Sequence, residues 1–318
     1  MMESDLGNTA DRIAALKDHF VWHERFEPLQ ERLSLLMEKR LADLSADRIT
    51  EARGIALSGA SGTGKSRAMT HLISGIWKRF AEHDLPHGAI ISLRVPSPAT
   101  LKSVGQMVLR ALGYKLSAER QAWYIWDLVR FQLRERKVLF LHLDEAQDLS
   151  SRGTRNEMTS VASMLKTLMT DEDWPVGIIL SGTTELEEIL NHDPQLARRM
   201  NTIRFDPISA GANAEDVQGL LAGYAKRGQI RLASDTVGIP LSERLIHAAA
   251  FQFGLVIEII IEAIELAYVR GDEILSQHHF AQTYTDRTAC ADAFNPFIVD
   301  DYYAIDARRV FTRETDRD

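Results

Sequence analysis

The sequence is nearly free of cysteine and has no long apolar run, and each shortage excludes a class of protein. The single cysteine, Cys290, cannot form an internal disulfide, which is typical of a reducing compartment. It also excludes a structural zinc site built on paired cysteines. No apolar run approaches the roughly twenty residues of a membrane span, and the first residues, MMESDLGNTADR, lack the pattern of a secretion signal. We therefore expect a cytoplasmic protein with no membrane segment.

Basic residues are outnumbered by acidic residues. Lys and Arg number 37 against 45 Asp and Glu, which gives a formal net charge of -8. This balance argues against general affinity for nucleic acid, so any DNA contact must come from local basic positions or from several subunits together. With 318 residues and 45% hydrophobic content, the chain can bury a large core and divide into a main domain and a smaller one.

Eight consecutive residues read GASGTGKS, a complete G-x-x-x-x-G-K-[ST] phosphate-binding loop. Gly59, Gly62 and Gly64 leave the backbone bare, so that consecutive N–H groups can wrap a phosphate. We expect Lys65 to reach the β and γ phosphates and the Ser66 hydroxyl to bind Mg²⁺. A strand-like run precedes the loop and a helical pattern follows it, as the motif requires. The predicted ATP-binding residues are Gly59, Ala60, Ser61, Gly62, Thr63, Gly64, Lys65, Ser66 and Arg67.

Apolar strand-like runs alternate with helical stretches over the middle of the chain. Five such runs predict a parallel sheet covered by helices on both faces. We predict an α/β fold, a three-layer αβα core with a five-stranded parallel sheet, followed by a small all-helical lid. The runs span residues 54–59, 89–95, 138–145, 176–182 and 202–208. The expected parts are a helical lead-in at 1–50, the nucleotide-binding core at 51–210, the lid at 211–290 and a tail at 291–318.

The third run, VLFLHLDE, ends in two adjacent carboxylates, as a Walker B strand does. The C-terminal ends of parallel strands line the ligand crevice, so we expect Asp144 to hold Mg²⁺ near the phosphates. Glu145 is then placed to orient and deprotonate the attacking water. The alternative is a helix N-cap followed by a solvated acid. The buried-type strand and the phosphate loop favour the catalytic interpretation.

Two later segments supply further catalytic candidates. In VGIILSGTTEL we predict that Thr183 hydrogen-bonds the attacking water, with Ser181 in reserve, although these hydroxyls could equally cap the next helix. Arg198 and Arg199 precede the last strand, and one of them is a candidate arginine finger that meets the developing charge in a neighbouring subunit. The alternative is a surface arginine paired with Asp193 or Asp206.

Together, GASGTGKS, LHLDEAQDL, SGTTEL and DPQLARR resemble the AAA+ ATPases and, more narrowly, the TniB family of transposition regulators, related to TnsC and MuB. The resemblance covers roughly residues 10–285. It implies a DNA-binding ATPase that forms a homo-oligomer, a ring or a helical filament, on double-stranded DNA. ATP would lie between subunits, and hydrolysis would drive disassembly. The implied protein partners are a transposase of the TniA or TnsB type and a target-selection protein of the TniQ type.

The resemblance also implies DNA contacts after the second strand, where Arg94, Thr100 and Lys102 stand at the matching places. Ordinary solvated side chains are the alternative there. Many AAA+ proteins carry an arginine early in the third lid helix, but the matching stretch here is FGLVIEIIIEA. This departure is compatible with a slow ATPase used as a switch.

Several features have less specific interpretations. The basic cluster Arg130, Arg134, Arg136 and Lys137 is expected on a solvated helix face. The aromatic residues Trp123, Trp126 and Phe131 are expected in the core, with base stacking as the alternative. The aromatic tail either binds a partner or packs on the lid as a strap. Two other functions stay open: an AAA+ loader or initiator that delivers a helicase or another enzyme to DNA, and an ATP-switched protein-interaction module without a DNA role.

Overall fold

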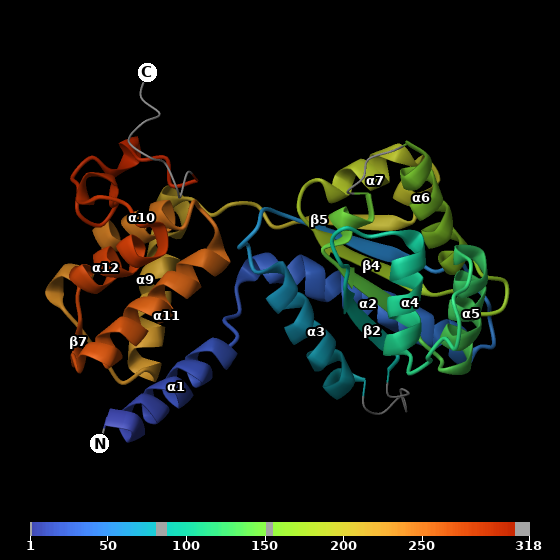
Figure 1. Ribbon diagram of the computed structural model, residues 1–318, viewed down its shortest axis with the longest axis horizontal. Helices are drawn as coiled ribbons and strands as arrows, with labels where there is room; N and C mark the ends of the chain where they lie inside the picture. The colour runs from blue at the N-terminus through green and yellow to red at the C-terminus, as the bar shows by residue number, and fades with distance from the viewer. Residues whose placement is uncertain (1, 81–87, 151–154, 309–318) are drawn as a thin grey trace. The chain divides into compact units, whose positions relative to one another are not determined.

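The computed structural model describes residues 2–80, 88–150 and 155–308, which are arranged in two compact units (Figure 1). The core unit consists of residues 22–60 and 65–205. The helical unit consists of residues 1–21 and 206–318 together with the short loop segment 61–64. The expected lead-in is therefore shared between the units, with its first helix in the helical unit.

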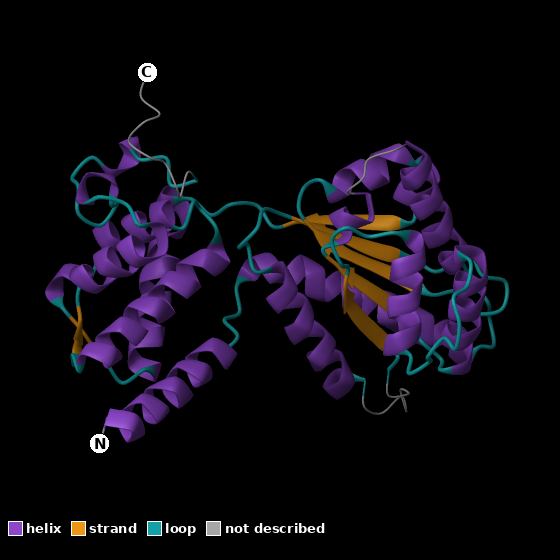
Figure 2. Ribbon diagram, viewed as in Figure 1, coloured by secondary structure: helices purple, strands orange, loops and turns teal. Residues whose placement is uncertain are grey.

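A five-stranded parallel sheet forms the centre of the core unit, with the strand order β2-β3-β4-β1-β5 (Figure 2). Four of the five predicted runs contain one strand each, and the run at 202–208 overlaps β5, which begins two residues earlier. The predicted α/β class is confirmed. Strands β1 and β4 are buried along their whole length because helices cover both of their faces. The strands are β1 (Gly54–Ser58), β2 (Ile90–Arg94), β3 (Phe140–Asp144), β4 (Gly177–Gly182) and β5 (Met200–Arg204).

Helices cover the two faces of this sheet in the core unit. On one side lie α2 (Glu27–Ser45) and α3 (Lys65–Arg79), joined by a hydrogen bond from Arg79 to Ser34. The helices on the other side share one apolar cluster with the sheet, in which Val104, Ile125 and Leu165 are fully buried. They are α4 (Leu101–Ala111), α5 (Ala122–Glu135), α6 (Arg155–Met169), α7 (Leu186–His192) and α8 (Pro194–Ala197). Short 3₁₀ turns lie at Glu24–Phe26 and Ala146–Ser150.

The helical unit is built around α11 (Phe253–Arg270), which is apolar on nearly every side and largely buried. The other helices are α1 (Met2–Asp18), α9 (Ala210–Arg227), α10 (Ile239–Ala248) and α12 (Gln277–Thr288). The expectation of helices alone was incomplete, because two-residue strands β6 (Arg231–Leu232) and β7 (Ile274–Leu275) pair in parallel. No single helix in the described residues could cross a membrane. Helices α10 and α11 reach that length and apolar content only as a pair bent by 111°.

The described part of the tail packs on the helices of this unit as a strap. Asn295 is fully buried and donates to the carbonyl of Ala281 at 2.7 Å. The ring of Phe297 is 2% exposed and lies 5.8 Å from that of Phe280. Short 3₁₀ turns at Asp292–Phe294 and Tyr302–Ala304 shape the strap. The expected tail residues from 309 onward, Phe311 among them, lie outside the described part of the chain.

Candidate nucleotide-binding site

The phosphate loop joins the end of β1 to the start of α3. Gly62 and Gly64 have φ angles of 80° and 93°, a left-handed backbone that favours glycine. Lys65 is the first residue of α3, and its Nζ donates to the carbonyls of Gly59 and Ala60, both at 2.8 Å. Helix α3 thus begins at the loop, and the positive end of its dipole favours an anion there.

The electrostatics around Lys65 show which acidic groups lie near it. Burial lowers the pKa of Lys65, whereas the nearby carboxylates of Glu145 and Asp144 act in the opposite direction. The side chain is 8% exposed, so these charges act with little screening by solvent. The structure therefore brings the predicted phosphate-binding lysine together with both carboxylates of the predicted Walker B strand.

Glu145 lies at a sharp turn directly after β3, with a left-handed φ of 55°. Such a backbone is uncommon for a non-glycine residue, and here it forms the turn that follows the strand. Its Oε1 forms an ion pair with Nη2 of Arg94 at 3.4 Å, and its Oε2 accepts from Nε2 of Gln147 at 2.8 Å. Sequence reasoning missed Gln147, because its approach to Glu145 depends on this turn. Both oxygens of the predicted base are therefore held by neighbours.

Thr183 follows β4 and lies beside the same turn. Its backbone N–H donates to Oε1 of Gln147 at 3.1 Å. Its Oγ1 is buried and has no hydrogen-bond partner among the described residues. A buried hydroxyl without a partner is costly unless another group, such as a bound water or ligand, satisfies it. This geometry fits the predicted contact of Thr183 with the attacking water, whereas the reserve candidate Ser181 donates to Asp144.

Asp144 and Ser66 are the residues that would hold Mg²⁺. Asp144 ends β3, and Ser66 is exposed in the first turn of α3. Mg²⁺ is usually bound by one or two carboxylates and takes its other ligands from phosphates and water. One carboxylate and one hydroxyl fit that pattern. The metal would neutralise charge on the β and γ phosphates.

The two predicted finger candidates differ in their surroundings. Arg199 forms an ion pair with Glu51 through its Nε, but the two atoms are not aligned as a hydrogen bond. The Nη1 of Arg199 donates to the carbonyl of Gln195 at 2.7 Å. Arg198 is exposed, and its guanidinium forms no hydrogen bond or ion pair with a described residue. The alternative pairing with Asp193 is not formed, because Asp193 binds Lys166 at 2.5 Å. Arg198 is thus the better candidate for a contact outside its own chain.

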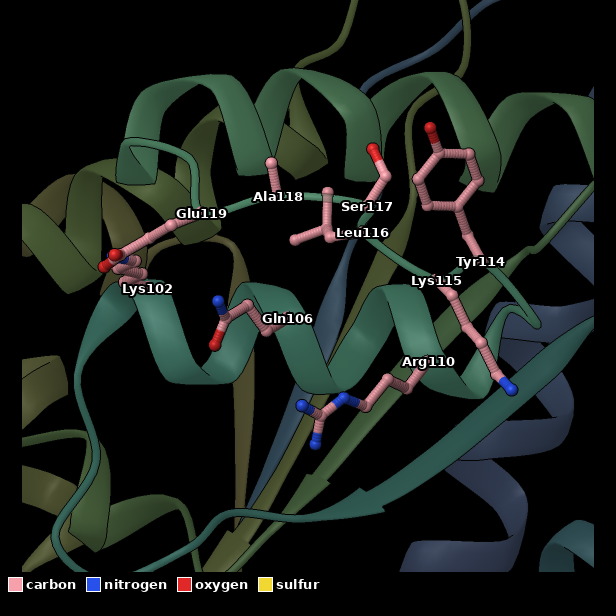
Figure 3. Close-up of a pocket in the computed structure, with 9 residues that line it drawn as sticks. All are labelled: Lys102, Gln106, Arg110, Tyr114, Lys115, Leu116, Ser117, Ala118 and Glu119. Atoms are coloured by element: carbon pink, nitrogen blue, oxygen red, sulfur yellow. The ribbon is translucent and has the colours of Figure 1, made fainter.

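Each of the three predicted DNA-contacting side chains already has a partner within the chain. Arg94 is ion-paired with Glu145, with its side chain 77% exposed. Thr100 caps α4 by accepting from the backbone N–H of Ser103 at 3.1 Å. Lys102 binds Glu119 at 2.5 Å, at one end of a surface pocket of about 620 Å³ (Figure 3). Arg110 and Lys115 extend at the other end of this pocket.

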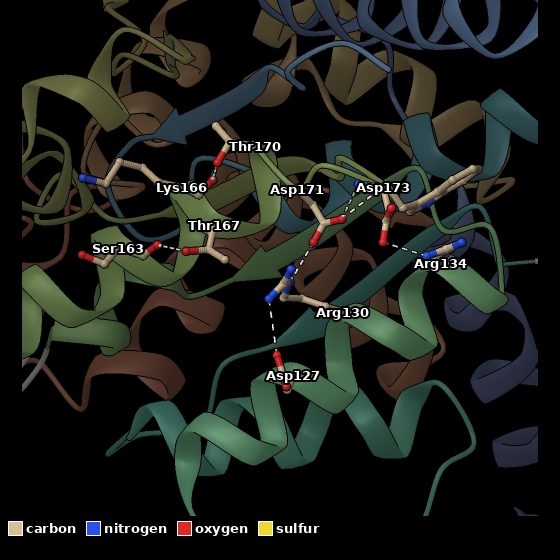
Figure 4. Close-up of polar contacts among 10 residues, drawn as sticks. Asp127, Arg130, Arg134, Ser163, Lys166, Thr167, Thr170, Asp171 and Asp173 are labelled. Atoms are coloured by element: carbon tan, nitrogen blue, oxygen red, sulfur yellow. Dashed lines mark hydrogen bonds and ion pairs between the residues drawn. The ribbon is translucent and has the colours of Figure 1, made fainter. Parts of the chain in front are cut away.

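Helix α5 carries a solvated basic face, as expected. Arg130 binds Asp171 and Arg134 binds Asp173, each at 2.7 Å, which ties α5 to the segment after α6 (Figure 4). Trp126 is in the core at 9% exposure. The expected core position was wrong for the other two aromatic residues of this helix, because Trp123 is 71% exposed and Phe131 is 55% exposed.

Comparisons with known proteins identify the family and the fold. The model of the family described as Bacterial TniB protein matches residues 12–209. The ORC1 protein of Aeropyrum pernix, solved in complex with DNA, is similar in structure with a TM-score of 0.62 and 16% identity, over 84% of this chain and 66% of that chain. This chain therefore spans just under two thirds of that protein's length.

Two further solved structures have a similar fold. Cdc6p from Pyrobaculum aerophilum gives a TM-score of 0.62 at 16% identity, over 86% of this chain and 70% of that chain. Drosophila ORC bound to DNA gives 0.58 at 16% identity, over 91% and 67%. Comparison with curated protein sequences gave no match. At these identities the structural likeness shows the fold alone.

Proposed function

The chain belongs to the TniB family and is an AAA+ ATPase, and from this premise we propose that it is an ATP-dependent DNA-binding regulator of transposition. It assembles as a homo-oligomer on double-stranded DNA and recruits or activates a transposase of the TniA or TnsB type. A target-selection protein of the TniQ type is the expected second partner, and the cytoplasm is the expected location. ATP binding favours assembly, and hydrolysis favours disassembly.

One observation carries the ATP-dependent part of this proposal. The carboxylates of Glu145 and Asp144 lie near enough to Lys65 to oppose the lowering of its pKa by burial. Thr183, whose backbone N–H binds Gln147 at the same turn, has a buried hydroxyl without a partner among the described residues. These groups match the tasks of phosphoryl transfer to water: a cation on the phosphates, a metal ligand, a general base and a group that orients the water. Phosphoryl transfer also gains from a cation that stabilises the charge developing on the γ phosphate.

Arg198 supports the placing of ATP between subunits. Its exposed guanidinium is available to a neighbouring protomer, where it would meet charge that develops on the transferred phosphoryl group. This arrangement makes hydrolysis depend on assembly, which suits a switch. A monomer would then bind ATP without hydrolysing it efficiently.

The ion pair between Arg94 and Glu145 supports a link between DNA and hydrolysis. A DNA phosphate that attracts Arg94 competes with the carboxylate for the same guanidinium, and the released Glu145 is then available to water. Because every protomer offers the same cations to DNA, a filament collects positive charge along the duplex although each chain has a net charge of -8.

The decisive experiment is DNA binding with a non-hydrolysable ATP analogue, with ADP, and without nucleotide. Fluorescence anisotropy on labelled duplexes of increasing length should show tight binding only with the ATP analogue. The affinity should rise with duplex length and fall as salt is added. Indifference to DNA in every nucleotide state would rule out this function and favour the protein-interaction module.

A loader or initiator is the second candidate, because two proteins with this fold were solved with DNA and carry the ORC name. A pull-down with the products of neighbouring genes separates the two candidates. Capture of a transposase supports the transposition regulator. Capture of a replicative helicase supports the loader.

A further inference from the structure

Strand register places four polar side chains on one face of the sheet. Ser92 on β2 lies opposite His142 on β3, and Asp144 on β3 lies opposite Ser181 on β4. Side chains alternate along a strand, so His142 and Asp144, two residues apart, point to the same face. The four residues therefore form a continuous row that crosses three strands and ends at the carboxylate assigned to Mg²⁺.

The hydrogen bonds along this row have one direction. Ser181 Oγ lies 2.5 Å from Oδ1 of Asp144, and an ionised carboxylate only accepts, so the serine proton points to it. Nε2 of His142 lies 2.8 Å from the same Oγ and must therefore donate to it. The imidazole Nδ1 then accepts from the hydroxyl of Ser92, also at 2.8 Å.

The polar side chains of this row are buried, where apolar side chains would usually be favoured. His142 is 2% exposed and Ser181 fully buried, at positions where an apolar side chain would extend the sheet core. Within this row the ring N–H lies on Nε2 and points to Ser181, while Nδ1 accepts from Ser92.

We propose that Ser181 and His142 are positioning residues for Asp144. Ser181 occupies Oδ1 and fixes the rotation of the carboxylate, which leaves the second oxygen for Mg²⁺ or its water. His142 holds the Ser181 hydroxyl in the orientation that donates to Asp144, and Ser92 holds the ring. Outer groups that orient a ligand are known to change metal affinity by about 10- to 100-fold when they are removed. The inference rests on the proposed metal role of Asp144.

The test measures how Mg²⁺ changes the affinity for a fluorescent ADP, titrated with Mg²⁺ and, separately, in EDTA. For Ser181→Ala we expect the Mg²⁺ concentration at half-effect to rise about tenfold, with affinity in EDTA unchanged. His142→Leu removes the donor to Ser181 and should show a smaller rise. His142→Gln keeps an N–H donor at that place and should restore most of the wild-type response.

Two controls separate this inference from simpler effects. Ser242→Ala removes an equally buried serine hydroxyl in the helical unit and should leave the Mg²⁺ response unchanged. Asp144→Asn tests the metal assignment itself. If Asp144→Asn does not weaken the response, the proposed metal role is wrong. Melting temperatures measured without nucleotide report any loss that is merely structural.

The inference is overturned if Asp144→Asn weakens the Mg²⁺ response while Ser181→Ala leaves it unchanged. Should Ser181→Ala fail to fold, the two His142 variants carry the test. Equal Mg²⁺ responses of His142→Leu and His142→Gln would then refute the inference. Steady-state kinetics add a second readout, in which Ser181→Ala lowers kcat at limiting Mg²⁺ and recovers when Mg²⁺ is raised.

Discussion

Replacing Arg94 by alanine should raise the ATPase rate in the absence of DNA. The guanidinium lies 3.4 Å from the carboxylate of Glu145, a separation at which two unit charges interact by roughly 1 kcal/mol in water. Arg94 is 77% exposed, and pairs of this kind contribute about 0.2–1 kcal/mol when measured. If that energy restrains the base, its loss speeds hydrolysis by at most about fivefold, since 1.4 kcal/mol corresponds to a factor of ten.

The assay is steady-state phosphate release by wild type and Arg94→Ala, with and without duplex DNA. The variant should be faster without DNA and should gain less from DNA than the wild type. Salt gives an independent check, because raising the ionic strength toward about 1 M screens the pair. That change should speed the wild type without DNA, relative to Arg94→Ala.

Arg94→Lys and Arg110→Ala are the matched controls. The lysine keeps a positive charge and should keep much of the restraint, whereas Arg110 is an exposed cation on α4 away from the pair. A basal rate in Arg94→Ala equal to or below that of the wild type would refute the argument. So would full DNA stimulation in the variant, since DNA then acts elsewhere.

Further predictions concern the groups around the nucleotide. Lys65→Ala should abolish nucleotide binding and assembly, measured with a fluorescent nucleotide and by light scattering, because the phosphates lose their cation. Glu145→Gln should bind ATP but lower kcat by at least about 100-fold, and normal turnover would show that another group is the base. Thr183→Val should lower kcat with little change in ATP affinity, and an equal loss of both would contradict its role with water. Arg198→Ala should be inactive alone but regain turnover when mixed with Glu145→Gln, because each variant supplies what the other lacks. Arg199→Ala should instead lower the melting temperature, and recovery of its activity in the same mixture would exchange the two roles.

Most of the sheet was predictable from the sequence because β1, β3 and β4 are compact apolar runs with helical stretches between. Strand β5, MNTIR, alternates buried with more exposed residues, and its start was placed two residues too late. The phosphate loop and the pair Asp144 and Glu145 were equally accessible, since their residues are adjacent in the chain. The turn at Glu145 explains why Gln147 was missed: a local reversal with φ of 55° brings the amide back onto the carboxylate. No periodicity reports such a reversal.

Contacts across strands were beyond the sequence for a different reason. Ser92 and His142 are 50 residues apart, and their bond follows from the pairing of β2 with β3. A single sequence shows the period of each strand but not its neighbour or register. Helix α5 shows the same limit, because helical spacing defines a face but does not say how much of it other elements cover. Trp123 and Phe131 were misplaced on that account.

The C-terminal strap affects how shortened forms of the protein should be cut. Arg244 donates to the carbonyls of Pro296 and Val299, at 2.5 and 2.6 Å, and so fastens the strap to α10. Deletion from residue 291 would remove Phe297 from its contact with Phe280 and expose a hydrophobic patch on the helical unit. Loss of partner binding after such a deletion would be hard to distinguish from aggregation of the truncated protein. Trimming after residue 308 spares these contacts and makes the cleaner comparison.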